Sequence, residues 1–414
     1  MHANLPFKSL HSVDVEGKRV LLRLDINSPI DPACKKILNT NRIVQSGPTV
    51  KWLLDNKAKV AIIAHQGDTL DYQNLISMEE HACKLSEVVG YPIAYIDDVC
   101  GPAAQERVEK LHSGEAILLG NLRYLCEEIS TFEEVVPLTA QEMKDTYLVR
   151  SLAPLFDLYV NEAFSAAHRN APSMVAFQYI LTSVAGPLLF KEVSALSKVM
   201  KNPTKPSVFV LGGAKISDAF GMIGNVLKDG SADTVITTGV TGEIFLLAQG
   251  YDLGVKVDYF LNERSLKKYI TQAKELIEAF PNSILYPRDL AFEHNGKRVE
   301  VEIEKLPVDE LFLDIGENSI KLFSEVIKKA GTIFVNGPAG KFESPIFEHG
   351  TKMLWRAISD STGYSVVGGG DSVMAATKFC NVEDFDYVCT AGGAMVRFLS
   401  GRKLPLLEAL EHAK

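Results

Sequence analysis

Positively charged and polar side chains recur just after short β-prone runs in the first half of the chain. The guanidinium group of arginine binds phosphate or carboxylate oxygens through paired hydrogen bonds. Any single arginine, however, more often pairs with a carboxylate on the protein surface. Recurrence after four separate runs favours a shared anion pocket. The runs are "RVLLRL" (19–24), "KVAIIA" (59–64), "EAILLG" (115–120) and "DLYV" (157–160), and the residues that follow them are Asp25, Asn27, Arg42, His65, Arg123 and Arg169.

Glycines follow the β-prone runs of the second half instead. Four such segments are "LGGAK", "VNGPAG", "VVGGGDS" and "TAGGAM". Glycine lets the backbone approach a ligand closely, and free N–H groups at a helix N-terminus bind anions. Asp371, directly after three glycines, is placed to hold a Mg²⁺ that phosphates carry, and Lys215 opens a predicted helix. One glycine pair is equally well explained as a tight turn, but several in one half predict a nucleotide site.

An alternation of strands and helices must position these residues. Amphipathic helical patterns lie between many of the β-prone runs, which predicts an α/β fold with parallel sheets and helices on both faces. Ligands bind at the carboxyl ends of such strands. The pattern changes over 172–206, where "FKEVSALSKVMKNPTKP" reads as a helix followed by a link with prolines. The runs of the second half are 207–212, 234–239, 332–337, 364–369 and 387–392.

Composition limits the class of protein. The 414 residues are 46% hydrophobic and 23% charged, as in an ordinary soluble globular protein of two or three domains. No apolar run is long enough to span a membrane, and a net charge of −9 argues against nucleic acid as a partner. Six cysteines without C-x-x-C spacing indicate reduced thiols in a cytoplasmic enzyme. Neither a Walker P-loop nor a G-x-G-x-x-G fingerprint is present.

The same segments, taken in order, resemble the phosphoglycerate kinase family. The first half carries "LLRLDINSP", "NRI", "AHQG", "GNLRY" and "YVNEAFSAAHR", and the second half carries "LGGAKISD", "DIG", "FVNGPAGKFE", "GGGDS" and "TAGGA". Together these blocks cover almost the whole chain, and their residues resemble the archaeal-type branch of the family more than its other members. The resemblance implies a reversible phosphoryl transfer between 1,3-bisphosphoglycerate and ADP, giving 3-phosphoglycerate and ATP, with Mg²⁺, in glycolysis and gluconeogenesis.

The resemblance also implies an architecture of two Rossmann-like three-layer lobes with parallel sheets, joined by a hinge helix. Residues 1–187 would form a phosphoglycerate-binding lobe and residues 188–395 a nucleotide-binding lobe, with the hinge helix at about 188–202. Residues 396–414 would be a tail that returns to the first lobe. The expected partners are the small-molecule substrates, without nucleic acid or membrane, and the oligomeric state is left open between monomer and homodimer.

Roles for individual residues are implied by their positions in the matching blocks. Arg42, Lys215 and Gly370 would be catalytic, and Asp371 would bind the metal. The substrate site would comprise Asp25, Asn27, Arg42, His65, Gln66, Gly67, Arg123 and Arg169. The nucleotide site would comprise Gly213, Ala214, Lys215, Asn336, Pro338, Glu343, Gly368, Gly369, Gly370, Asp371 and Ser372.

Two positions depart from the family pattern. Asp68 stands where the family's "H-x-G-R" block has arginine, and Ala219 stands where a second lysine would follow Lys215 by one helical turn. We expect both departures to be tolerated, and a lysine at 219 to share the face of Lys215. The alternatives are a degenerate paralogue that binds nucleotide without turnover, and an NAD-type oxidoreductase, which the missing fingerprint disfavours.

Overall fold

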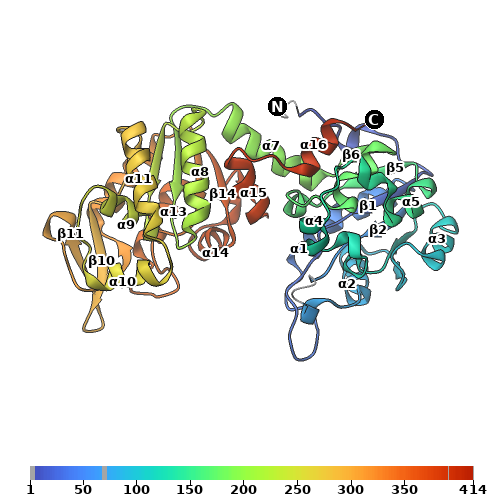
Figure 1. The fold of residues 1–414 in the computed structure, drawn as a ribbon, viewed down its shortest axis with the longest axis horizontal. Helices are drawn as coiled ribbons and strands as arrows, with labels where there is room; N and C mark the ends of the chain where they lie inside the picture. Colours follow the sequence, from blue (N-terminus) through green and yellow to red (C-terminus); the bar gives the residue numbers. More distant parts are fainter. Residues whose placement is uncertain (1–4, 68–71, 390, 414) are drawn as a thin grey trace. The chain divides into compact units, whose positions relative to one another are not determined.

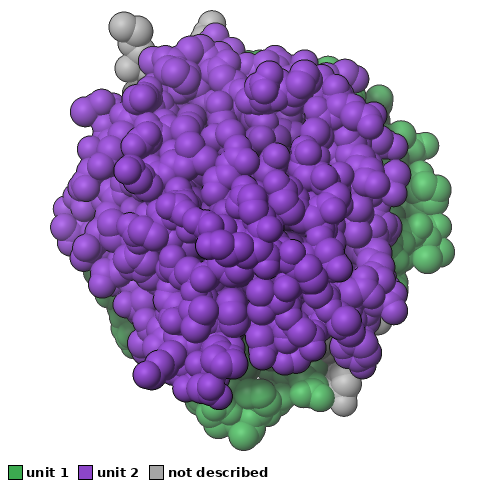
Figure 2. Space-filling view, turned by 90° about the vertical axis from the view of Figure 1, so that its left-hand side faces the viewer, with its two compact units in different colours: residues 1–194, 403–414 green, residues 195–402 purple. Residues whose placement is uncertain are grey.

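The structure is a computed structural model that describes residues 5–67, 72–389 and 391–413. The chain divides into two compact units (Figure 1). Unit 1 consists of residues 1–194 and 403–414, and unit 2 consists of residues 195–402, shown in green and purple in Figure 2. In the described part of the chain, no helix is both long and apolar enough to cross a membrane.

Unit 1 is built on a parallel sheet in which, over the described residues, six strands follow the order β3-β4-β2-β1-β5-β6. Its central strands are buried along nearly their whole length, as expected for a parallel sheet covered on both faces. The strands are β1 (Arg19–Arg23), β2 (Lys59–Ile63), β3 (Ile93–Tyr95), β4 (Ala116–Leu118), β5 (Leu158–Asn161) and β6 (Thr182–Ala185). The helices are α1 (Asn41–Asp55), α2 (Glu79–Val89), α3 (Pro102–Glu109), α4 (Ser130–Val135), α5 (Tyr147–Leu152), α6 (Pro172–Val175) and α16 (Pro405–Glu411).

The strand order explains how the polar residues of unit 1 come together. The four predicted runs became β1, β2, β4 and β5, and these strands are neighbours in the sheet. Arg23, the last residue of β1, is level with Ile63 of β2 and with Asn161 of β5. The segments that leave these strands therefore start from one edge of the sheet.

Unit 2 contains a second parallel sheet, with six described strands in the order β15-β14-β13-β7-β8-β9. The strands are β7 (Ser207–Leu211), β8 (Thr234–Thr237), β9 (Ile284–Leu285), β13 (Thr332–Asn336), β14 (Tyr364–Gly368) and β15 (Tyr387–Val388). The helices are α8 (Ile216–Lys228), α9 (Gly239–Ala248), α10 (Val255–Glu263), α11 (Lys268–Ala279), α12 (Glu317–Lys328), α13 (His349–Ser359), α14 (Gly370–Phe379) and α15 (Gly392–Leu399). The expectation of two α/β units with parallel sheets is confirmed.

A small antiparallel sheet in unit 2 was not expected from the sequence. It has the order β11-β10-β12 among the described residues, with β10 (Asp289–His294), β11 (Lys297–Glu302) and β12 (Phe312–Ile315). A two-residue turn joins β10 to β11, and both its residues, Asn295 and Gly296, have positive φ. Asn-Gly between two β-prone segments is a typical hairpin signal, so the sequence did contain the evidence.

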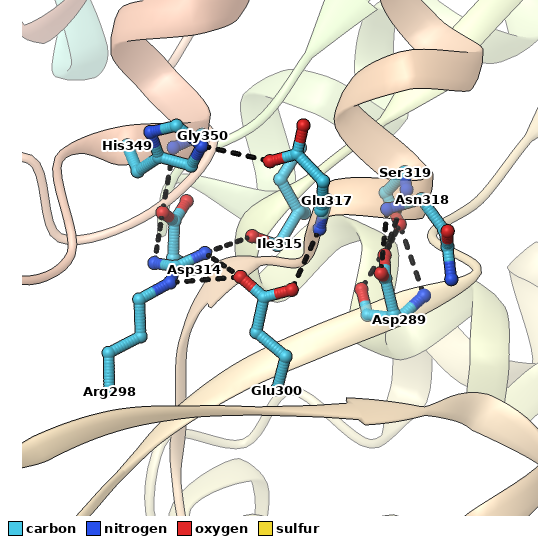
Figure 3. A network of polar contacts seen from close by, with 10 residues as sticks. All are labelled: Asp289, Arg298, Glu300, Asp314, Ile315, Glu317, Asn318, Ser319, His349 and Gly350. Carbon is cyan, nitrogen blue, oxygen red and sulfur yellow. Dashed lines mark hydrogen bonds and ion pairs between the residues drawn. The ribbon is translucent and has the colours of Figure 1, made fainter.

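Carboxylates fasten this small sheet to the helices beside it (Figure 3). Asp314 of β12 accepts hydrogen bonds from Arg298 Nη1 at 2.7 Å and from the Gly350 N–H at 2.8 Å. Asp289 of β10 accepts from the N–H groups of Asn318 and Ser319, both at 2.8 Å, in the first turn of α12. The bonds from Gly350, Asn318 and Ser319 satisfy N–H groups at the N-termini of α13 and α12 and tie β12 and β10 to these helices. The bond from Arg298 of β11 lies within the small sheet.

The segment between the units in the sequence is a helix. α7 (Pro187–Lys201) overlaps the stretch expected at about 188–202 and runs past residue 194, after which the chain enters unit 2. Glu162 caps its start by accepting from the N–H groups of Leu188 and Leu189, at 3.1 and 3.2 Å. The expected tail, 396–414, straddles the division between units: the end of α15 lies in unit 2, and residues 403–414 belong to unit 1.

Candidate functional site

Unit 1 has a cavity of about 570 Å³ beside the carboxyl ends of its central strands. Every residue that the sequence assigned to the substrate site lines this cavity. Among the described lining residues, four arginines outnumber two carboxyl groups, so the cavity suits an anion. The expected residues in its wall are Asp25, Asn27, Arg42, His65, Gln66, Gly67, Arg123 and Arg169. Asp68 lies outside the described residues.

Asp25 and Arg42 form an ion pair in the cavity wall. Arg42 Nη1 lies 2.8 Å from Asp25 Oδ2, which also accepts a hydrogen bond from the Ser165 hydroxyl. Burial by itself would raise the pKa of the Asp25 carboxyl, but the neighbouring His65 ring, Arg42, the Ser165 hydroxyl and Arg23 together hold it below its ordinary value. Asp25 is therefore ionised and orients Arg42 at the start of α1.

Arg23 is a site residue that the sequence reading missed. It is the last residue of β1, it is buried, and its Nη2 lies 3.0 Å from Nδ1 of His65. Burial, together with the positive charge of Arg23, lowers the pKa of His65 well below its usual value. Because Arg23 can only donate, the neutral His65 ring accepts at Nδ1 and carries its proton on Nε2. A charged residue inside an apolar strand was the signal for Arg23.

The other two arginines are held by acceptors in the wall. Arg123 donates to the Glu128 carbonyl, and its Nε lies 3.4 Å from the Gly67 carbonyl oxygen. Arg169 donates to the Ser130 hydroxyl and lies 3.6 Å from the Glu133 carboxylate. These contacts orient both guanidinium groups before any ligand arrives, which reduces the entropy lost on binding.

Gln66 lines the cavity, but its side chain has structural partners. Its Oε1 accepts from the Ser28 N–H at 2.8 Å, its Nε2 donates to the Ser28 carbonyl at 3.0 Å, and His81 Nε2 lies 3.0 Å from Oε1. The Gly67 N–H in turn donates to Asn27 Oδ1 at 3.2 Å. The amide of Gln66 thus joins the segments after β1 and β2 and positions the groups around it.

Unit 2 has a cavity of about 360 Å³ beside its glycine loops. Of the residues expected at a nucleotide site, Gly213, Ala214, Pro338, Glu343 and Asp371 line it. Lys215, Asn336, Gly368, Gly369, Gly370 and Ser372 are not in its lining. Lys215 and Gly370 are next in sequence to the lining residues Ala214 and Asp371. Ser372, in the first turn of α14, accepts a hydrogen bond from the loop after β13.

Glycine is required where the loops after β7 and β13 meet. Gly213 and Gly337 have φ of +74° and +90°, and a Cβ on Gly337 would overlap the carbonyl oxygen of Gly212. The Gly213 N–H donates to the Pro338 carbonyl at 2.8 Å, and the Gly337 N–H donates to Ser372 Oγ at 2.7 Å. Ser372 therefore holds the loops together from within α14.

Lys215 directly precedes α8, and its Nζ lies 3.7 Å from Asp371 Oδ2 at the start of α14. The Lys215 side chain is 71% exposed, whereas Ala219 is only 2% exposed and lies on the buried face of α8. The two positions therefore do not share an open face. The expectation that a lysine at 219 would share the face of Lys215 stays a prediction, and such a side chain would have to start from the buried face of α8.

Apolar side chains make up a further part of the unit 2 cavity wall, and the sequence reading did not include them. The small antiparallel sheet and α10 supply most of them. This wall gives the cavity a surface suited to a flat heterocyclic ring. The residues are Val240, Phe260, Leu290, Leu311, Phe312, Leu313 and Ile315.

Asp371 has the chemistry that a phosphate-borne Mg²⁺ requires. Its carboxylate is half exposed, lines the cavity, and stands in the first turn of α14. A Cβ built on the neighbouring Gly370 would meet no atom within 4 Å, so space is open beside it. Across the described residues, no three histidine, cysteine or carboxylate side chains gather into a metal site.

Comparisons with known proteins agree on one family. The family model described as phosphoglycerate kinase matches residues 10–402. The phosphoglycerate kinase of Methanothermus fervidus is 41% identical over 408 residues, covering 99% of this chain and 98% of that protein. The one from Pyrococcus furiosus is 38% identical over 406 residues, covering 97% of each.

Solved structures give the same result. The crystal structure of phosphoglycerate kinase from Pyrococcus horikoshii matches with a TM-score of 0.86 and 36% identity, covering 98% of both chains. The structure of phosphoglycerate kinase from Coxiella burnetii matches with a TM-score of 0.84 and 33% identity, covering 99% of this chain and all of the other.

Proposed function

The chain belongs to the phosphoglycerate kinase family, and we propose that unit 1 binds the glycerate substrate and unit 2 the nucleotide. The enzyme is a phosphotransferase of glycolysis and gluconeogenesis. It moves a phosphoryl group reversibly between 1,3-bisphosphoglycerate and ADP, with a carboxyl group of 3-phosphoglycerate as the acceptor. The resemblance read from the sequence is confirmed, and neither the degenerate paralogue nor the NAD-type oxidoreductase finds support in the comparisons.

The cationic cavity of unit 1 is the observation that carries this assignment of substrates. Arg123, Arg169 and His65 would hold the non-transferred phosphate, because their donors share one cavity. Asp25 and Asn27 would bind the glycerate hydroxyl and carboxyl end. Arg42, which Asp25 orients, would contact the phosphoryl group during transfer.

In unit 2 the glycine loops would bind the nucleotide. The backbone N–H groups around Gly213 and at the start of α14, from Gly369 to Ser372, would meet the phosphates. Asn336, Pro338 and Glu343 would line the nucleoside part, with Glu343 on the ribose. These roles follow from the matched segments and from the loops' position at the carboxyl ends of β7, β13 and β14.

In phosphoryl transfer the protein mainly positions the two substrates and supplies positive charge near the transferred group. Lys215 and Arg42 would neutralise charge that builds up on the transferred group, and Gly370 would donate its N–H. Asp371 would hold Mg²⁺, which, when bound, offsets the charge of the nucleotide phosphates. No general base is needed, because the acceptor carboxylate is already ionised. We place the enzyme in the cytoplasm, as a monomer or homodimer.

The test of the substrate assignment is the Arg169→Ala variant. Removing one guanidinium donor to a phosphate should raise the KM for 3-phosphoglycerate about tenfold or more and leave the KM for ATP within about twofold. Arg150→Ala, which removes an exposed arginine of α5, is the matched control and should change neither. Equal rises in both KM values for Arg169→Ala would contradict the assignment of the glycerate to unit 1.

A further inference from the structure

Glu243 is a buried acid in the wall of the unit 2 cavity, and it is not among the residues assigned to the phosphates, the ribose or the metal. It is 5% exposed, and no hydrogen bond or ion pair joins its carboxyl to any residue in the described ranges. Buried polar groups are normally paired with a protein group, water or a ligand. A carboxyl left without a protein partner beside a cavity is available to a ligand.

The surroundings of Glu243 define which part of a ligand it would meet. It lies on the same face of α9 as Gly239 and Val240, and all three line the cavity. Phe260 and Leu290 also line it, from α10 and β10. A largely apolar wall with a few placed polar groups is the usual environment for an aromatic base, where the polar groups determine specificity.

We propose that Glu243 recognises the base of the nucleotide, with its carboxyl hydrogen-bonding the amino group and an adjacent ring nitrogen of adenine. The inference rests on the proposed nucleotide site in unit 2. It adds to that site a residue that determines specificity.

The protonation state of Glu243 suits adenine. Burial raises the pKa of its carboxyl to about 8, so at neutral pH the group has one O–H donor and one C=O acceptor. Adenine offers the complement, an N–H donor next to a ring-nitrogen acceptor. The other ionisable groups of the cavity wall are Asp314, which Arg298 neutralises, and Lys341, Glu343 and Asp371. None of them contributes to the shift, which burial alone causes.

The first test compares ATP with purine riboside triphosphate, which lacks the amino group. The parent enzyme should have a KM about tenfold lower for ATP, because a site built around a hydrogen bond rejects an analogue that lacks it. Glu243→Leu should remove this preference. Glu243→Gln should keep it, since an amide also has a donor and an acceptor. Glu278→Leu, at an exposed position of α11, is the control and should behave like the parent.

The second test uses pH. As pH rises from 7 to 9, the carboxyl ionises and loses its donor, so the KM for ATP should rise about tenfold in the parent. In Glu243→Gln it should stay flat, because an amide does not titrate in this range. A purely structural role for Glu243 would give both enzymes the same pH profile, which would overturn the proposal.

The outcomes separate the inference from the function on which it rests. If the parent turns over ATP and Glu243→Leu keeps the tenfold preference for ATP over purine riboside triphosphate, Glu243 does not bind the base. The assigned reaction would still stand. If the parent does not bind ATP at all, the nucleotide site itself is wrong. Should Glu243→Leu fail to fold, the pH profiles of the parent and Glu243→Gln still decide the question.

Discussion

Lys215 lies at the meeting point of two helix N-termini in unit 2. It precedes α8 directly, and its ammonium group is 3.7 Å from the carboxylate of Asp371 in α14. A mobile, exposed ammonium can follow charge as it moves between phosphate oxygens, so its contact should strengthen in the transition state. This makes Lys215 the residue in unit 2 on which the rate should depend most.

Lys215→Ala should therefore lower kcat by about 10²- to 10³-fold, with little change in nucleotide affinity. Steady-state kinetics and nucleotide titration would measure the two quantities separately. Lys228→Ala is the control. It removes an exposed lysine at the C-terminal end of α8 and should leave both kcat and the nucleotide affinity unchanged. A loss of affinity that matched the loss of kcat would mean that Lys215 only binds the nucleotide.

Residue types and spacing were enough to predict which side chains of unit 1 gather in one cavity. Asp25, His65 and Arg123 each follow a strand, and a parallel sheet brings its strand ends to one edge. Arg23 could not be found in this way, since it lies within the apolar run and not after it. The burial of Ala219 could not be predicted either, because the spacing of residues along a helix does not show which face of the helix other elements cover.

At the scale of elements, two glycines of unit 2 should respond differently to the same change. Gly337 needs its positive φ and leaves no room for a Cβ, whereas a Cβ on Gly370 would enter open space. Gly337→Ala should destabilise unit 2 by about 2 kcal/mol or more. Gly370→Ala should leave stability within about 0.5 kcal/mol and weaken ADP binding about tenfold, because the methyl group would occupy the proposed phosphate site.

Urea denaturation and ADP titration of both variants would check this contrast. Gly230→Ala is a useful control, since it also has a positive φ but no neighbour within 4 Å of a Cβ, so it isolates the backbone strain. Loss of stability in Gly370→Ala, without an effect on binding, would argue that α14 has only a structural role.

The alternating elements of both parallel sheets could be predicted from runs of β-branched and apolar residues. Three short edge strands, β3, β6 and β9, could not, because two to four residues carry too little pattern. The β10–β11–β12 sheet was overlooked for another reason: β11 is largely charged and exposed, as "KRVEVE", and resembles a surface helix or loop. The apolar wall of the nucleotide cavity was missed along with this sheet.

At the scale of the whole molecule, we propose that the two substrates bind to different units, which α7 joins in sequence. Transfer requires the donor and acceptor groups to come into line and water to be excluded, since water would hydrolyse the acyl phosphate. Small-angle scattering should therefore show a smaller radius of gyration with 3-phosphoglycerate and Mg-ATP together than with either alone. An unchanged radius in the ternary complex would count against closure about α7.

The most direct measurement is a coupled assay of phosphoglycerate kinase activity on the purified chain. We expect turnover that requires 3-phosphoglycerate, ATP and Mg²⁺ together, and that falls by at least a hundredfold in Lys215→Ala. Binding of ATP without turnover in the parent chain, under conditions where 3-phosphoglycerate also binds, would contradict the central claim that these two cavities carry out phosphoryl transfer.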